Sequence, residues 1–86
     1  MLIKYSKNAL KYLARADKQT VKRIRAAIEG LTLTPPEGDI KILQGYSDGR
    51  QRLRVGKYRV IFRFISDDQI EIVYIIDIGA RGDIYK

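Results

Sequence analysis

The sequence predicts an α+β fold, in which a two-helix hairpin packs on one face of a small, mainly antiparallel and twisted sheet of about four strands. In the first third of the chain, apolar residues recur three or four positions apart, which is typical of amphipathic helices. From Arg50 onward the apolar residues alternate with polar ones, which is typical of strands. The apolar helix stripes and the inner strand faces must cover each other.

The first half of the chain is expected to form one short strand and two helices. Residues 2–5 are the strand, Ser6 or Asn8 is expected to cap the first helix, and Asp17 the second. The apolar stripes consist of Ala9, Leu10, Leu13 and Ala16 in the first helix and Val21, Ile24, Ile28 and Leu31 in the second. Pro35-Pro36 stops the second helix, because proline cannot continue its hydrogen-bond ladder.

The second half is expected to form a meander of strands. Residues 37–49 contain three glycines and are expected to form a loop with one short extended piece. Strands are then expected over residues 50–55, 58–65 and 70–78, with tight turns at Gly56-Lys57 and Asp67-Asp68. The stretch from 70 to 78 is the most apolar and is expected to be the most buried. No linker or repeat divides residues 1–86, so a single domain is predicted.

Composition restricts the classes of function. The 86 residues include 17 Lys and Arg against 10 Asp and Glu, a formal net charge of +7 that favours a nucleic acid or another acidic partner. There is no cysteine or histidine, so no disulfide scaffold is possible, and neither a metal site nor a cofactor is expected. No segment approaches the roughly 20 apolar residues of a membrane span, and no secretory signal is present, so a cytoplasmic location without membrane contact is expected.

Arginines concentrate around the predicted hairpin and after the last predicted strand. Arg50, Arg52 and Arg54 alternate along one strand, and Arg59 lies on the next. The small, polar segment that ends the chain carries Arg81, Tyr85 and Lys86. Guanidinium groups match phosphate oxygens, and tyrosine rings stack on bases. A solvated strand face and surface ion pairs are the alternative interpretation of the same arginines.

Two sequence motifs resemble a known family. They are LRVGKYRVIF at residues 53–62 and IGARGDIY at residues 78–85. The chain is similar over its whole length to RelE/ParE-superfamily toxins of type II toxin–antitoxin systems. The segment Ile42-Leu43-Gln44-Gly45 also resembles a PLKG-like segment of that family. The resemblance implies a compact toxin bound by a cognate acidic antitoxin, RelB-like or similar.

The resemblance implies two alternative activities. RelE-like members cleave mRNA in the ribosomal A site, with the ribosome and mRNA as partners, whereas ParE-like members poison DNA gyrase. The expected function is ribosome-dependent mRNA cleavage; a gyrase inhibitor, a catalytically inactive toxin fold and a small nucleic-acid-binding module are the alternatives. The fold alone does not choose among them.

The resemblance also assigns candidate site residues. The catalytic positions fall on Arg52, Arg59, Arg81 and Tyr85, and flanking RNA contacts are expected from Arg50, Arg54, Lys57 and Lys86. Ala80 replaces the histidine or lysine that the family often has before its last arginine. RNA cleavage by the 2′-hydroxyl needs a base, charge stabilisation and an acid. Arginine keeps its proton near neutral pH, so Tyr85 is the candidate base.

Overall fold

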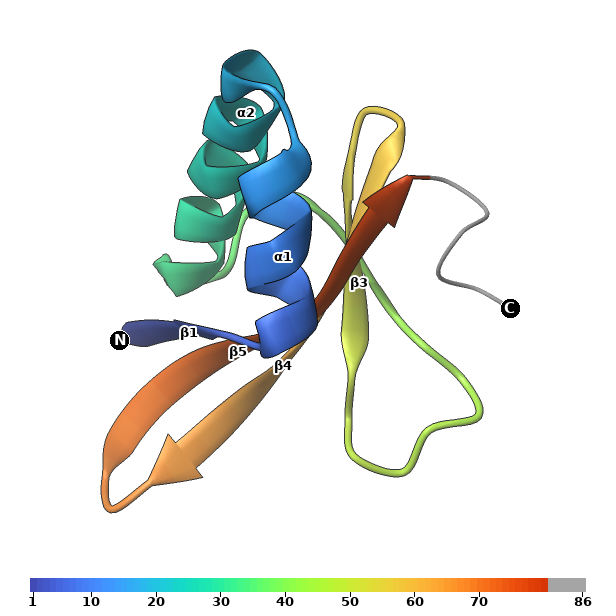
Figure 1. The fold of residues 1–86 in the computed structure, drawn as a ribbon. Helices are drawn as coiled ribbons and strands as arrows, with labels where there is room; N and C mark the ends of the chain where they lie inside the picture. The colour runs from blue at the N-terminus through green and yellow to red at the C-terminus, as the bar shows by residue number, and fades with distance from the viewer. Residues whose placement is uncertain (81–86) are drawn as a thin grey trace.

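The computed structural model describes residues 1–80, and it is a two-layer arrangement of helices on a sheet (Figure 1). In chain order the elements are β1 (Leu2–Tyr5), α1 (Lys7–Arg15), α2 (Lys18–Glu29), the 3-10 turn η1 (Gly30–Thr32), β2 (Asp39–Ile42), β3 (Gln51–Val55), β4 (Tyr58–Asp67) and β5 (Ile70–Ala80). The two helices form a hairpin on one face of the sheet (Figure 1). The predicted fold class is therefore confirmed.

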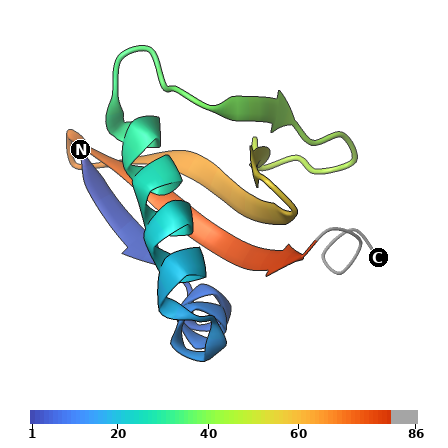
Figure 2. The same cartoon turned by 90° about the horizontal axis from the view of Figure 1, so that it is seen from above.

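The sheet has five strands in the order β1-β5-β4-β3-β2, one strand more than expected. β1 pairs with β5 in parallel, and the other neighbours are antiparallel. The extra strand, β2, is the short extended piece predicted within residues 37–49, and it pairs with β3 along its whole length. Figure 2 shows β1 and β2 at the two edges, with α2 crossing the sheet between them.

Both helices begin at side-chain caps. The Ser6 hydroxyl accepts a hydrogen bond from the Ala9 amide at 3.0 Å, and the Asp17 carboxylate accepts one from the Thr20 amide at 2.7 Å. Ser6 is thus the first cap, and Asn8 lies within α1. α2 ends at Glu29, before the prolines, because the chain tightens into η1, whose Gly30 carbonyl accepts a bond from the Glu37 amide.

β5 contains an irregularity that the alternation of its residues does not predict. Ile61 pairs with Asp77 but the next residue, Phe62, pairs with Ile75, so Ile76 is an extra residue in β5. The Ser6 hydroxyl donates a hydrogen bond to the Ile76 carbonyl at 2.6 Å. One serine therefore caps α1 and also satisfies the backbone of the bulge.

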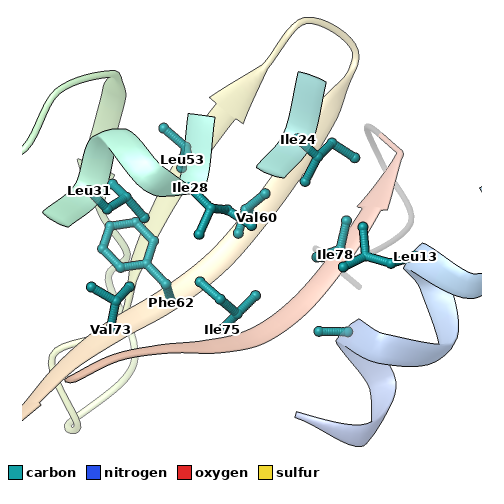
Figure 3. Packing of buried hydrophobic residues seen from close by; sticks show 11 residues of the cluster. Leu13, Ile24, Ile28, Leu31, Leu53, Val60, Phe62, Val73, Ile75 and Ile78 are labelled. Carbon is teal, nitrogen blue, oxygen red and sulfur yellow. The ribbon is translucent and has the colours of Figure 1, made fainter. Parts of the chain in front are cut away.

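The core lies between the helix hairpin and the sheet (Figure 3). Its residues come from both helices, η1 and the three central strands: Ala9, Leu13, Ile24, Ile28, Leu31, Leu53, Val60, Phe62, Val73, Ile75 and Ile78. Most of the helix stripes predicted from sequence are here. Leu10 is an exception, at 49% exposed. Phe64 lies beside Phe62, with ring centroids 5.5 Å apart, but is 39% exposed, because the β4–β5 hairpin extends past the helices (Figure 1).

Candidate functional site

A cationic cleft lies on the sheet face opposite the helices. Leu53 points into the core, so its neighbours Arg52 and Arg54 point to the other face. Cross-strand pairing places Lys41 beside Arg52, and Arg54 directly opposite Arg59. The cleft has a volume of about 510 Å³ and is lined by Lys41, Ile42, Leu43, Gln44, Arg52, Arg54 and Arg59. Four basic residues thus share one hollow on three adjacent strands.

Arg59 is the most enclosed charge in this cleft. It is only 7% exposed, and its guanidinium donates one long hydrogen bond, to the Tyr58 carbonyl at 3.4 Å. Within residues 1–80, no carboxylate forms an ion pair with it. Directly opposed like charges destabilise a strand pair by about 0.2–1 kcal/mol. An anion bound between Arg54 and Arg59 would offset that repulsion.

Arg52 and Arg54 are more accessible than Arg59. Arg52 is half-buried, and its nearest carboxylate oxygen, on Asp39, is 3.7 Å away in a side chain that is 58% exposed. A partner this distant and this solvated contributes little. Arg54 is exposed and forms no ion pair with the described carboxylates. Both guanidinium groups therefore remain available to an anion in the cleft.

Arg50 has different surroundings from the other predicted arginines. It precedes β3 and does not line the cleft. Its guanidinium pairs with Asp48 at 2.8 Å and lies over the ring of Tyr46, 4.2 Å from the centroid. The hydrogen bond from Arg50 lowers the pKa of Asp48, and the same bond raises the pKa of Arg50. The pair therefore stays charged over the whole physiological range.

The other predicted site residues either lie away from the cleft or fall outside the described part of the chain. Lys57 lies in the β3–β4 turn, with its ammonium 5.5 Å from the ring centroid of Tyr58, a residue that packs against the core on the helix side. Arg81, Tyr85 and Lys86 lie outside the described residues. The structure thus unites Arg52, Arg54 and Arg59, and it separates Arg50 and Lys57 from them.

Sequence reasoning missed two residues at or near the cleft. Lys41 enters through the pairing of β2 with β3, a contact between distant parts of the chain. Tyr46 lies in the loop that follows β2, beside Arg50. The only sequence signal for Lys41 was its place between Ile40 and Ile42, which puts it on the opposite face of an extended piece.

Neither a metal centre nor a membrane helix is found in the part of the chain that the structure describes. Residues 1–80 contain no group of three or more acidic side chains placed to hold a metal ion. α2, with 12 residues, is the longest helix described, and no helix there has the length and apolar character of a membrane span.

Comparison with known families decides the class of protein. The family described as ParE toxin of type II toxin-antitoxin system, parDE, matches residues 3–85. The chain belongs to this family. It is thus a toxin of a type II toxin–antitoxin system, within the RelE/ParE superfamily. No curated protein matches it.

Solved structures of related toxins share the fold of this ParE-family toxin. It is similar to the archaeal RelE–RelB complex from Pyrococcus horikoshii OT3, with 27% identity, 95% and 96% of the two chains covered and a TM-score of 0.71. The RelB–RelE complex from Methanococcus jannaschii matches with 25% identity, 95% and 94% coverage and a TM-score of 0.69. The YoeB/ParE toxin from Agrobacterium tumefaciens has a TM-score of 0.77 over 94% and 99% of the chains, and at 18% identity it shows the fold alone.

Proposed function

We propose that this toxin is a ribosome-dependent mRNA endonuclease that inhibits translation. The supporting observation is the convergence of Arg52, Arg54 and Arg59 on one cleft, with Arg59 enclosed and unpaired by any described carboxylate. Permanently charged, planar guanidinium groups suit a phosphate whose charge grows in the transition state. The cleft is open on the sheet face that the helices leave uncovered, where a single RNA strand has access.

The proposed reaction is attack of a ribose 2′-oxygen on the adjacent phosphorus. The 2′-O–P bond forms and the P–O5′ bond breaks. The hydroxyl proton passes to a base, and the leaving 5′-oxygen takes a proton from a water molecule. Arg52 and Arg59 stabilise the phosphorane charge, together with Arg81. Tyr85 takes the hydroxyl proton or holds the hydroxyl in line, and nearby guanidinium groups favour its phenolate.

The path of β5 beside the cleft supports the roles proposed for Arg81 and Tyr85. β5 is described as far as Ala80, which pairs with Tyr58, and its neighbour Gly79 pairs with Arg59. Arg81 follows Ala80 directly in the sequence, and Tyr85 follows four positions later. The peptide chain therefore leaves the described part next to the strand that carries Arg59.

The test is to express the toxin in bacteria and to follow protein synthesis, DNA replication and transcript integrity together. We expect protein synthesis to stop first, with transcripts cut within codons. Tyr85→Phe and Arg52→Gln should each slow cleavage of ribosome-bound mRNA by at least about 100-fold, the usual contribution of a proton-transfer or charge-stabilising group. Lys11→Gln, on the exposed face of α1, is the control and should cleave normally. Cleavage by Tyr85→Phe at the normal rate would remove that residue from the mechanism.

Inhibition of DNA gyrase is the second candidate. It is favoured by the family match, which is to ParE toxins, and by the lack of any histidine and the presence of Ala80 where a base or acid is often found. The same expression experiment distinguishes the two. DNA-damage induction with gyrase-linked breaks, and with intact transcripts, would replace the endonuclease proposal by this one.

We also infer that an acidic, RelB-like antitoxin neutralises this toxin. The two archaeal relatives are described as RelE with RelB, and the net charge of +7 suits an acidic partner. An antitoxin segment across the cleft would compete with RNA for the same guanidinium groups. Because such contacts are screened by ions, its affinity should fall as salt rises.

A further inference from the structure

We propose that Tyr46 is a stacking platform for one nucleobase of the single-stranded RNA whose phosphates occupy the cleft, and that Arg50 is the residue that positions it. This inference rests on the proposed RNA-binding function and adds a base contact to it. It also gives Arg50 a different task from that of the cleft arginines, because Arg50 is engaged within its own loop.

Tyr46 is unusually accessible for an aromatic residue. It is 50% exposed, whereas Phe64, the other exposed aromatic residue within residues 1–80, is 39% exposed. The Arg50 guanidinium lies 4.2 Å from its ring centroid, which is within the range of a cation–π contact. Arg50 therefore covers part of the ring and fixes its orientation, and the exposed remainder is free to receive a flat partner.

Arg50 is itself held by three contacts. Its Nε and Nη2 atoms donate to the Asp48 carboxylate, the shortest bond being 2.8 Å. Its backbone amide donates to the same carboxylate at 3.2 Å, and its carbonyl accepts a bond from the Leu43 amide at 3.2 Å. Arg63 adds a long bond of 3.5 Å to the Asp48 carbonyl. The loop from Leu43 to Arg50 is thus closed, and Arg50 is neutralised within it.

The position of the loop places Tyr46 beside the bound backbone. Leu43 and Gln44 line the cleft, and Tyr46 lies two residues after Gln44, within about 7 Å along the chain. The loop projects beyond the sheet, away from the helices (Figure 1). A base attached to a sugar whose phosphate contacts Arg52 or Arg54 can therefore reach the Tyr46 ring. Aromatic stacking of this kind accepts any base, since every base has a π-face.

The competing explanation is that the Tyr46–Arg50 contact only stabilises the loop. The two explanations differ in whether the effect of Tyr46 depends on the presence of a base. A purely structural tyrosine would influence intact and base-free RNA equally. A stacking tyrosine would lose its effect when the stacked base is removed.

The experiment measures binding of short, fluorescently labelled single-stranded RNA by anisotropy at low salt, using intact RNA and a set in which one nucleotide at a time is abasic. We expect Tyr46→Ala to weaken binding of intact RNA about 5- to 150-fold, the range for one aromatic–base stack. Tyr46→Phe should stay within about twofold. One abasic position should weaken binding to the wild-type toxin and abolish the difference between wild type and Tyr46→Ala.

Two results would overturn this inference alone. One is normal RNA binding by Tyr46→Ala, and the other is an equal loss with intact and abasic RNA at every position. Absence of RNA binding by the wild-type toxin would instead reject the RNA-binding function itself, and the inference with it.

Arg50→Gln tests the positioning role. In the wild-type background it should weaken binding of intact RNA, and in the Tyr46→Ala background it should add no further loss. A loss in the Tyr46→Ala background, together with a smaller salt dependence, would show that Arg50 contacts a phosphate and would contradict the positioning role.

Discussion

The charge of Arg59 lowers the stability of the free toxin and favours the binding of an anion. The guanidinium of Arg59 is nearly covered and has no described carboxylate partner. It also faces Arg54 across the strand pair. Placing a charge in such a position costs free energy unless a counter-charge arrives. A bound phosphate group supplies that counter-charge, so the toxin is expected to be more stable with RNA bound.

Replacing Arg59 by methionine tests whether the charge of Arg59 destabilises the free toxin. The methionine side chain is unbranched and uncharged but two atoms shorter, so it removes the repulsion with Arg54 and keeps the packing of the arginine's aliphatic part. We expect the free energy of unfolding to be unchanged or higher by up to about 1 kcal/mol, with RNA binding and toxicity lost. Urea unfolding followed by circular dichroism gives the first quantity.

Arg15→Met, in the exposed last turn of α1, is the control, because Arg15 lies in the helix layer and does not line the cleft. It should leave toxicity unchanged. A loss of more than about 2 kcal/mol in Arg59→Met would mean that Arg59 is a structural residue.

At the scale of elements, Ser6 links a helix to the sheet. Its hydroxyl accepts from the Ala9 amide and donates to the Ile76 carbonyl, and its backbone amide donates to the Ile75 carbonyl at 2.8 Å. The bulge at Ile76 shifts the alternation of β5, so that Val73, Ile75 and Ile78 all reach the core. Ser6 therefore fixes where α1 lies on β5 and how β5 presents its residues.

Ser6→Ala should destabilise the toxin by about 2–3 kcal/mol, because it removes a helix cap and leaves the bulge carbonyl without its donor. Asp17→Ala is the matched comparison, since it removes a cap but no contact with the sheet. Its effect should be the smaller of the two in urea unfolding. Equal effects would show that the bond to Ile76 adds nothing.

The two caps also differ in their dependence on pH. Hydrogen bonds from Thr20 lower the pKa of Asp17 below its ordinary value. The stabilisation by Asp17 is therefore complete above the unfolded pKa of about 3.9 and is lost as the pH falls through the lower folded value. Ser6 does not titrate, so the difference in stability between wild type and Ser6→Ala should not change over this range.

The features that the sequence predicted are those that follow from local rules. Ser6 and Asp17 cap helices through their own side chains, and Gly56 tolerates the φ of +59° that the turn with Lys57 requires. β2 was predicted only as a short extended piece within a loop, because Ile40 and Ile42 do not indicate which strand it pairs with. The bulge at Ile76 was not predicted, since no local pattern marks it and its hydrogen bond to Ser6 joins residues seventy positions apart.

The candidate site was predicted in part for the same reason. Alternation indicated that Arg52 and Arg54 share a face, and the structure adds Arg59 and Lys41 to it through cross-strand pairing. The separation of Arg50 from the cleft depends on closure of the loop at Leu43, which local patterns do not specify. The roles of Arg81 and Tyr85 remain predictions from the family resemblance.

At the scale of the whole molecule, positive charge lies on both layers. The helices carry exposed basic residues such as Lys11, Lys18 and Lys22 on their outer faces, and the cleft lies on the opposite side of the sheet. The net charge of +7 therefore attracts RNA in general, whereas the cleft selects where the backbone is held. Individual charges in the two places should contribute differently to binding.

The most direct test of the cleft is the salt dependence of single-stranded RNA binding by Arg54→Gln and Lys11→Gln, each of which removes one exposed charge. For a single strand, each phosphate contact contributes about 0.7 to the slope of log affinity against log salt. We predict that Arg54→Gln lowers the slope by about that amount and weakens binding, while Lys11→Gln leaves the slope at the wild-type value. Equal slopes for both variants and the wild type would contradict a phosphate-binding cleft on this face of the sheet.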